Sequence, residues 1–262
     1  YGPRSGTEIE TPILRWFAGS DDISNLTFDV YLDTNTSPTT LVANDTSALS
    51  YTPSDLPKNT KYYWKVVATD PSGSKTSSVM NFTIPMTPEW SYETDGYVYA
   101  VAVSANGEYI VVGSEDKKVY LFEKGSNTPL WSYTAGGAVG AVSISADGVY
   151  IVAGSDDDKI YLFDKDSNTP QWSYTTEGDI YSVAISADGE YIAAGIGYYD
   201  DTWTGKIYLF DKDSSTPLWS YDPDSWIYSV DISGDGKYIV ASAINAAGDG
   251  DDDKVYLFNK DS

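Results

Sequence analysis

The sequence predicts an all-β protein, and three observations lead to that fold class. A phrase containing Trp-Ser-Tyr recurs in units that begin at Pro88, Pro129, Pro170 and Pro217. Between these phrases, short runs rich in Val, Ile and Tyr alternate as half-buried strands do. Asn-Gly and Asp-Gly pairs separate the runs and favour tight hairpin turns. Spacings of 41, 41 and 47 residues with four strands per unit are typical of a β-propeller.

Residues 1–87 lack the repeated phrase and predict a separate, smaller domain. Alternating runs at residues 13–17, 26–32, 62–70 and 79–84 predict strands separated by polar segments. This pattern is typical of a small β-sandwich. A short proline-containing connector follows, so we place the boundary between the sandwich (1–87) and the propeller (88–262).

Each repeated unit predicts four short strands, and the unit that begins at Pro170 illustrates the pattern. Residues 181–186 and 191–195 form two strands around a turn, residues 206–210 follow an acidic loop, and residues 218–221 form the last strand. Bulky side chains on both faces of residues 206–210 indicate a sheet sandwiched between like neighbours. Because one such blade cannot cover its own apolar faces, we expect the blades to stack around an axis. The tryptophans of the repeated phrase should wedge between adjacent blades: Trp90, Trp131, Trp172 and Trp219.

The last unit raises the question of how the ring closes. It contains the phrase KVYLFNKDS but no Trp-Ser-Tyr strand, whereas a spare copy lies at residues 89–92. We expect residues 89–92 to complete the last blade, which would close a ring of four blades and remove exposed sheet edges. Two alternatives remain open. The natural chain continues with further blades, or the unpaired edge accepts a strand from a neighbouring molecule and drives polymerisation.

Two stretches of the repeats resemble known propeller families. GSDDDKIYLFDKDSNTPQWSY (154–174) resembles the repeat of quinoprotein-type (PQQ-like) propellers and their non-enzymatic relatives, and VYAVAVSANGEYIVVGSEDKKVYLF (98–122) resembles a WD-repeat blade. The resemblance covers residues 88–262 and implies a propeller fold. Regular Asp-, Ser- and Thr-rich repeats of this kind are similar to those of large archaeal cell-surface proteins, especially from methanogens. The quinone-dependent enzymes of the first family need a larger ring and cationic help, and this propeller has no arginine.

A second resemblance concerns the first domain. LPKNTKYYWKVVATD (56–70) resembles the fibronectin type III pattern of a leucine, a proline and a tyrosine that opens an alternating strand. The resemblance implies that Tyr62 is the corner tyrosine and that Trp64, Val66 and Ala68 face inward. By the same resemblance, Trp16 is the core tryptophan of the preceding sheet.

Charge and composition exclude several classes of function. The formal net charge is -23, and Arg4 and Arg15 are the only arginines, so neither nucleic acid nor an anionic membrane surface is an expected partner. No apolar run approaches the roughly 20 residues that span a bilayer, so we expect no membrane insertion in this segment. Cysteine and histidine are absent, which excludes disulfides, thiol nucleophiles, imidazole metal ligands and a histidine base.

Three sets of residues are candidate sites. Clustered carboxylates in the loops before the third strands favour Ca²⁺, although a solvated hairpin is the alternative for each loop. Aromatic side chains in the longer loop of the third unit could stack on sugars or dock a partner. Sequons for N-glycosylation occur in the first domain alone. The calcium candidates are Asp156, Asp157, Asp158, Asp249, Asp251, Asp252 and Asp253; the partner-binding candidates are Tyr198, Tyr199 and Trp203; the glycosylation candidates are Asn25, Asn35, Asn44 and Asn81.

From these observations we expect a non-enzymatic, extracellular or cell-surface module. It would build a surface layer (S-layer), sheath or filament through contacts with itself or with other surface proteins. We expect no cofactor, apart from calcium if the acidic loops bind it. Three alternatives remain open: an adhesin that binds glycans through its loop aromatics, a carbohydrate-active enzyme that uses two carboxylates, and an intracellular WD-repeat scaffold.

Overall fold

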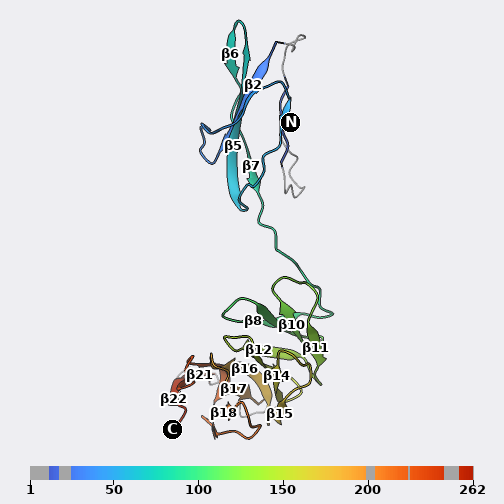
Figure 1. Ribbon diagram of the computed structural model, residues 1–262. Helices are drawn as coiled ribbons and strands as arrows, with labels where there is room; N and C mark the ends of the chain where they lie inside the picture. The colour runs from blue at the N-terminus through green and yellow to red at the C-terminus, as the bar shows by residue number, and fades with distance from the viewer. Residues whose placement is uncertain (1–11, 18–24, 199–203, 224, 245–253, 262) are drawn as a thin grey trace. The chain divides into compact units, whose positions relative to one another are not determined.

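The computed structural model describes residues 12–17, 25–198, 204–223, 225–244 and 254–261 (Figure 1). The chain forms two compact units, Tyr1–Glu89 and Trp90–Ser262. All the regular secondary structure within the described ranges consists of β-strands. Within those ranges there is no helix that is long and apolar enough to cross a membrane.

The first unit contains a five-stranded sheet and a short two-stranded one. In the larger sheet the order is β3-β2-β5-β6, and β7 pairs with the first half of β5. The smaller sheet pairs β1 with β4. The strands are β1 (Leu14–Arg15), β2 (Thr27–Asp33), β3 (Leu41–Thr46), β4 (Ser50–Tyr51), β5 (Thr60–Asp70), β6 (Gly73–Thr76) and β7 (Met80–Ile84). The predicted strands at 26–32, 62–70 and 79–84 are confirmed, whereas the one at 13–17 is reduced to two residues. Strands β3, β4 and β6 were not predicted because their residues are mostly exposed and polar, and therefore show no apolar alternation.

Alternation along the strands explains the core of this unit. Every second residue of β2, from Phe28 to Leu32, is buried, and the intervening residues are half-buried. In β5 the residues Tyr62, Trp64 and Val66 are buried on the same side, as expected for Trp64 and Val66, while Ala68 is half-buried. Trp16 packs into the same cluster and meets the ring of Phe28 at 5.7 Å.

The second unit consists of four antiparallel sheets that follow one another in chain order (Figure 1). We name them blade 1 to blade 4. Among the described residues, three blades have four strands and blade 4 has three, and this repetition of small antiparallel sheets is the β-propeller architecture that the repeats predict. Blade 1 comprises β8 (Val98–Val103), β9 (Tyr109–Ser114), β10 (Lys118–Glu123) and β11 (Trp131–Thr134); blade 2 comprises β12 (Val139–Ile144), β13 (Tyr150–Ser155), β14 (Lys159–Asp164) and β15 (Trp172–Thr175); blade 3 comprises β16 (Asp179–Ile185), β17 (Tyr191–Gly197), β18 (Gly205–Asp211) and β19 (Trp219–Tyr221); blade 4 comprises β20 (Trp226–Ile232), β21 (Tyr238–Ile244) and β22 (Lys254–Asn259).

The hairpin between the first two strands of each blade is held by one small motif. In blade 2, the buried hydroxyl of Ser145 donates to Asp147 at 2.7 Å and accepts the backbone N–H of Tyr150 at 3.0 Å. Gly148 follows with a positive φ of 79°, which glycine adopts at no steric cost. The same arrangement recurs in the other blades, so the predicted positive φ of the Asn-Gly and Asp-Gly turns is confirmed.

Candidate functional site

The contact between neighbouring blades repeats in the same form along the unit. Trp131 at the start of β11 lies against Phe163 of blade 2, with ring centroids 5.4 Å apart. Its indole Nε1–H donates to the backbone carbonyl of Lys165 at 2.8 Å. Trp172 and Trp219 make the same bond to carbonyls of blades 3 and 4. These three tryptophans lie between adjacent blades, as the sequence predicts.

A glycine in the second strand of each of the first three blades lets the next blade approach closely. A Cβ added to Gly195 of β17 would lie 2.5 Å from Cγ2 of Ile227 and 3.0 Å from Cγ1 of Val230, both in blade 4. Gly113 and Gly154 occupy the same position against blades 2 and 3. The neighbouring strand therefore inserts an aliphatic side chain where the glycine has none.

The first strand of blade 1 exposes a face that its counterparts bury. Val98 is 49% exposed, whereas Val139, at the same position of blade 2, is 0% exposed because blade 1 covers it. Val101 and Val103, farther along β8, are 68% and 61% exposed. We call this surface the incoming face of blade 1.

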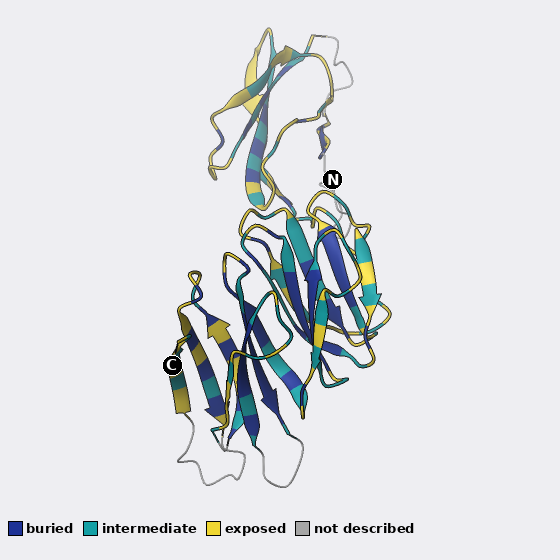
Figure 2. Cartoon of the chain, turned by 60° about the horizontal axis from the view of Figure 1, so that its bottom comes forward, coloured by how far each residue is buried: buried dark blue, intermediate teal, exposed yellow. Residues whose placement is uncertain are grey.

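The last strand, β22, also exposes apolar side chains that its counterparts in the other blades bury. Val255 and Leu257 of β22 are 75% and 70% exposed, while the residues at the same positions of the first three blades are 0% exposed. Figure 2 shows buried residues throughout the middle blades and exposed ones on the end strands. We call the surface of Val255 and Leu257 the outgoing face of blade 4. Both end faces are built like internal blade contacts but have no blade against them in this structure.

The spare Trp-Ser-Tyr segment packs on blade 1 and does not complete blade 4. Trp90 stacks on Phe122 at 5.3 Å and donates to the carbonyl of Lys124 at 2.7 Å, which repeats the Trp131 contact one blade earlier. Tyr92 meets Phe122 edge-on at 5.1 Å. Within the described residues, β22 pairs with β21 alone. The expectation that residues 89–92 complete blade 4 and close a four-bladed ring is therefore wrong for this structure, because the two partners lie at opposite ends of the row of blades.

The acidic loop of blade 2 forms hydrogen bonds with neighbouring parts of the same unit. Asp157 accepts the hydroxyl hydrogen of Tyr161 at 2.5 Å and the backbone N–H of Gly136 at 2.7 Å. Burial and this hydrogen bond raise the pKa of Tyr161, while partial desolvation and the charges of Asp157 and Asp158 raise the pKa of Asp156. Among the described residues, no three potential ligands lie close enough to hold a metal ion. The calcium candidates Asp249, Asp251, Asp252 and Asp253 lie outside these residues.

The candidate partner-binding loop is described only in part. Tyr198 directly follows β17 and is half-buried. Its hydroxyl donates to Glu177 at 2.8 Å. Burial first and this carboxylate second raise the pKa of Tyr198 to about 12. Glu177 also forms an ion pair with Lys206, so the ring of Tyr198 is held within blade 3. Tyr199 and Trp203 lie outside the described residues.

The four candidate glycosylation sites have one property in common. Their asparagine side chains are all exposed, in turns at Asn25 and Asn35 and in strands at Asn44 and Asn81. Exposure is required for the modification.

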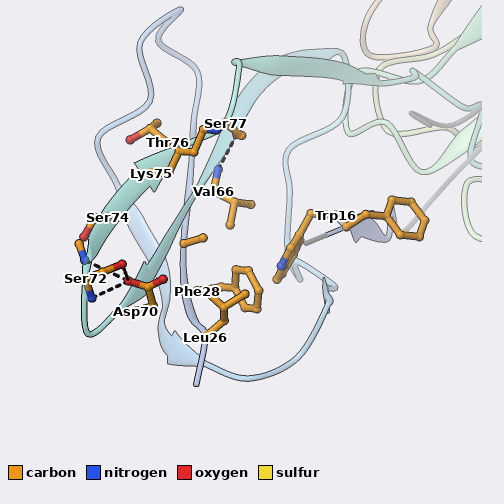
Figure 3. Close-up of a pocket in the computed structure, with 13 residues that line it drawn as sticks. Trp16, Leu26, Phe28, Val66, Asp70, Ser72, Ser74, Lys75, Thr76 and Ser77 are labelled. Atoms are coloured by element: carbon orange, nitrogen blue, oxygen red, sulfur yellow. Dashed lines mark hydrogen bonds between the residues drawn. The ribbon is translucent and has the colours of Figure 1, made fainter. Parts of the chain in front are cut away.

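The first unit also contains a cavity of about 640 Å³, drawn in Figure 3. Trp16 and Phe28 lie on one side of it and the β5–β6 hairpin on the other. Asp70 caps that hairpin by accepting the N–H groups of Ser72 and Gly73. Phe17 and Leu26 also line the cavity, and residues 18–24 between them lie outside the described residues. We therefore assign no ligand to the cavity.

Sequence reasoning did not identify the two end faces. Blade 4 differs from the other blades at one of these packing positions, because Ser242 stands where Gly113, Gly154 and Gly195 stand in the other blades.

Comparison with known proteins supports the propeller resemblance. Residues 64–223 match the family model described as outer membrane protein assembly factor BamB, and residues 215–259 match the WD domain, G-beta repeat. No curated protein matches the chain. Hydrazine synthase from Kuenenia stuttgartiensis is structurally similar, with 15% identity and a TM-score of 0.53 over 76% of this chain. The match spans 59% of the hydrazine synthase chain, and at this identity it shows the fold alone.

Proposed function

Because the chain belongs to the family of the outer membrane protein assembly factor BamB, we propose that it is a non-enzymatic module that acts through contacts with other proteins. The name of that family describes a factor in protein assembly, and we extend a role in assembly to this chain. The fold alone hosts many functions, so the proposal depends on the surfaces that this chain presents.

The observation that carries the proposal is the pair of apolar end faces. Val101 and Val103 at one end, and Val255 and Leu257 at the other, are more than 60% exposed. Contiguous apolar side chains of this kind mark surfaces that bind other proteins, because their burial stabilises a complex by about 25 cal/mol per Å². Each face also continues the pattern of an internal blade contact, which makes another β-sheet the fitting partner.

The roles of the described carboxylates favour a structural protein over a carbohydrate-active enzyme. Asp157 and its counterpart Asp116 each accept a tyrosine hydroxyl and a loop N–H. In Asp116, burial alone would raise the pKa, but the hydrogen bond from Tyr120 and further bonds lower it. A glycosidase instead needs two carboxylates that flank a substrate, whereas Asp116 and Asp157 are both engaged in hydrogen bonds within the fold.

We place this module at the cell surface, in a surface layer, sheath or filament of the archaeal, methanogen-like kind. The first unit would be a fibronectin type III-like sandwich, supported by the buried Tyr62, Trp64 and Val66 of β5. Its exposed sequon asparagines would carry glycans, which is compatible with an exported glycoprotein.

Localisation and assembly test this proposal directly. Immunogold labelling of intact source cells should place the protein on the outer surface, and electron microscopy of surface preparations should show it in ordered arrays. Labelling confined to the cell interior, or hydrolysis of any substrate in a polysaccharide panel by the purified chain, would overturn it.

A further inference from the structure

We propose that Asn81 carries an N-linked glycan whose first sugar packs on the ring of Tyr63, on the outer face of the five-stranded sheet of the first unit. This inference rests on the proposed function, because N-glycosylation requires export. It goes further by naming which of the four sequons has a contact for its sugar within the fold, and by giving the sugar a role in stability.

The strand β7 points both sequon side chains outward. Asn81 and Thr83 are exposed, while Phe82 between them is buried and stacks on Tyr62 at 5.6 Å between ring centroids. Successive residues of a strand point to opposite faces of the sheet, so the asparagine amide and the threonine hydroxyl share the outer face. A sugar on Asn81 therefore extends away from the core and leaves the Phe82 contact intact.

The neighbouring strand places an aromatic ring beside this asparagine. Tyr63 of β5 is directly opposite Asn81 in the antiparallel register and is half-buried on the same outer face. Side chains directly opposite each other have Cβ atoms about 4.5–5.5 Å apart. A sugar joined to Nδ2 of Asn81 thus lies within contact distance of the ring. Within the described part of the chain, β7 pairs with β5 alone, so no second strand crowds the asparagine.

The chemistry of the ring suits a sugar. Aromatic faces carry negative charge and attract groups with partial positive charge, such as the C–H groups of a sugar ring. The ammonium of Lys61, an exposed and flexible side chain, already lies 5.4 Å from the centroid of Tyr63. Covalent attachment holds the sugar at a high effective concentration next to the ring, so a weak contact is sufficient.

Two other sequons lack such a contact. The amide of Asn44 donates to the carboxylate of Asp45 at 3.1 Å, and a sugar on this nitrogen would disturb that bond and lie next to a negative charge. Asn35 lies in the loop after β2, where the residues at 34–37 are all exposed. In contrast, the side chain of Asn81 forms no hydrogen bond with any residue that the structure describes.

Peptide mapping of the protein purified from its source cells tests the modification. Trypsin cleaves after lysine, and residues 76–117 form one such peptide, in which Asn81 is the only sequon. This peptide should carry the mass of a glycan. Thr83→Val keeps a branched side chain but removes the sequon hydroxyl, so the same peptide of that variant should be unmodified. An unmodified wild-type peptide would overturn the proposal.

Melting of a chain secreted by a eukaryotic host tests the sugar contact. The glycan at Asn81 is trimmed by an endoglycosidase to a single N-acetylglucosamine. The first unit should melt about 2–6 °C higher with this sugar than in the Thr83→Val variant, because a stacked ring contact is lost with the sugar. Both chains carry substitutions that remove the other sequons: Asn25→Gln, Asn35→Gln and Asn44→Gln.

Removal of the ring separates stacking from a general effect of glycosylation. When Tyr63→Ser is added to both chains, the difference in melting temperature should fall to about 1 °C or less. The matched control keeps Asn35 as its only sequon and loses it by Ser37→Ala, and the sugar there should also change the melting temperature by about 1 °C or less. A difference that survives Tyr63→Ser, or an equal one at Asn35, would contradict the contact.

The outcomes separate this inference from the proposed function. A protein that forms surface arrays but carries no glycan at Asn81 would refute the glycan contact and leave the structural role intact. A protein that carries the stabilising glycan but forms no array would do the reverse.

Discussion

Replacing Gly195 by alanine should destabilise the propeller, although alanine normally stabilises a strand relative to glycine. Gly195 is buried in β17 and has no left-handed φ, so its backbone accepts alanine without strain. The obstacle is the neighbouring blade. The added Cβ would lie 2.5 Å from Cγ2 and 3.3 Å from Cβ of Ile227, and 3.0 Å from Cγ1 of Val230.

The size of the effect follows from these distances. Carbon atoms pack best about 3.5–4.0 Å apart, so blades 3 and 4 would have to separate locally by roughly 1 Å. Ile227 is completely buried and hydrogen-bonded into blade 4, so it cannot rotate into solvent. Overpacking of this kind costs about 1–3 kcal/mol, and the lower chain entropy of alanine in the unfolded state offsets about 0.4–1 kcal/mol of it. We expect a net loss of about 1–2 kcal/mol in the free energy of unfolding.

Urea unfolding of the full chain, followed by tryptophan fluorescence, measures this loss in the propeller transition. Gly125→Ala is the control, because a Cβ at Gly125 meets no atom within 4 Å. Ile227→Ala removes Cγ2, so the double variant with Gly195→Ala should lose less stability than the sum of the single variants. If Gly195→Ala stays within about 0.5 kcal/mol of both the wild type and the control, close packing of the blades does not depend on this glycine, and the reasoning fails.

Three further predictions concern side chains that form hydrogen bonds. Trp131→Phe keeps the aromatic ring but removes the donor to the Lys165 carbonyl, so the propeller should lose about 1 kcal/mol in urea unfolding, and an unchanged midpoint would contradict a role for that bond. Asp33 accepts three backbone N–H groups of its loop, and the one from residue 39 contributes most to lowering its pKa to about 2. Its folded pKa lies below the unfolded value, so its contribution is present above about pH 4 and is lost as the pH falls toward 2. Asp33→Asn should therefore flatten the pH dependence of the first unit's melting temperature in that range, and an unaltered profile would refute the assignment. Asp157→Asn removes the anionic acceptor of the Tyr161 hydroxyl, so the pKa of Tyr161 should fall in an ultraviolet titration, and a rise would contradict the structure.

Much of the fold could be predicted because its signals are local. Alternation along residues 26–32 and 62–70 identifies β2 and β5, since a strand with one buried face repeats every two residues. The Asp-Gly and Asn-Gly turns identify the hairpins, because few residues other than glycine adopt a positive φ readily. The period of the Trp-Ser-Tyr phrase identifies the blades.

The candidate sites were harder to predict, because local sequence does not report a side chain's partners. Asp157 belongs to a carboxylate cluster that suits calcium, yet its hydrogen bonds to Tyr161 and Gly136 come from residues that the fold brings together. Tyr198 stands in a loop rich in aromatic residues, yet Glu177 and Lys206 hold it within blade 3.

By itself, the sequence determined that the chain is all-β, that residues 88–262 form like sheets, and that each sheet has two apolar faces. Only the tertiary structure decided which faces are covered. Val98 and Val139 have equivalent places in the repeat, yet one is 49% exposed and the other fully buried. Burial depends on whether another blade lies against the strand, and a repeated sequence carries the same apolar pattern with or without that neighbour.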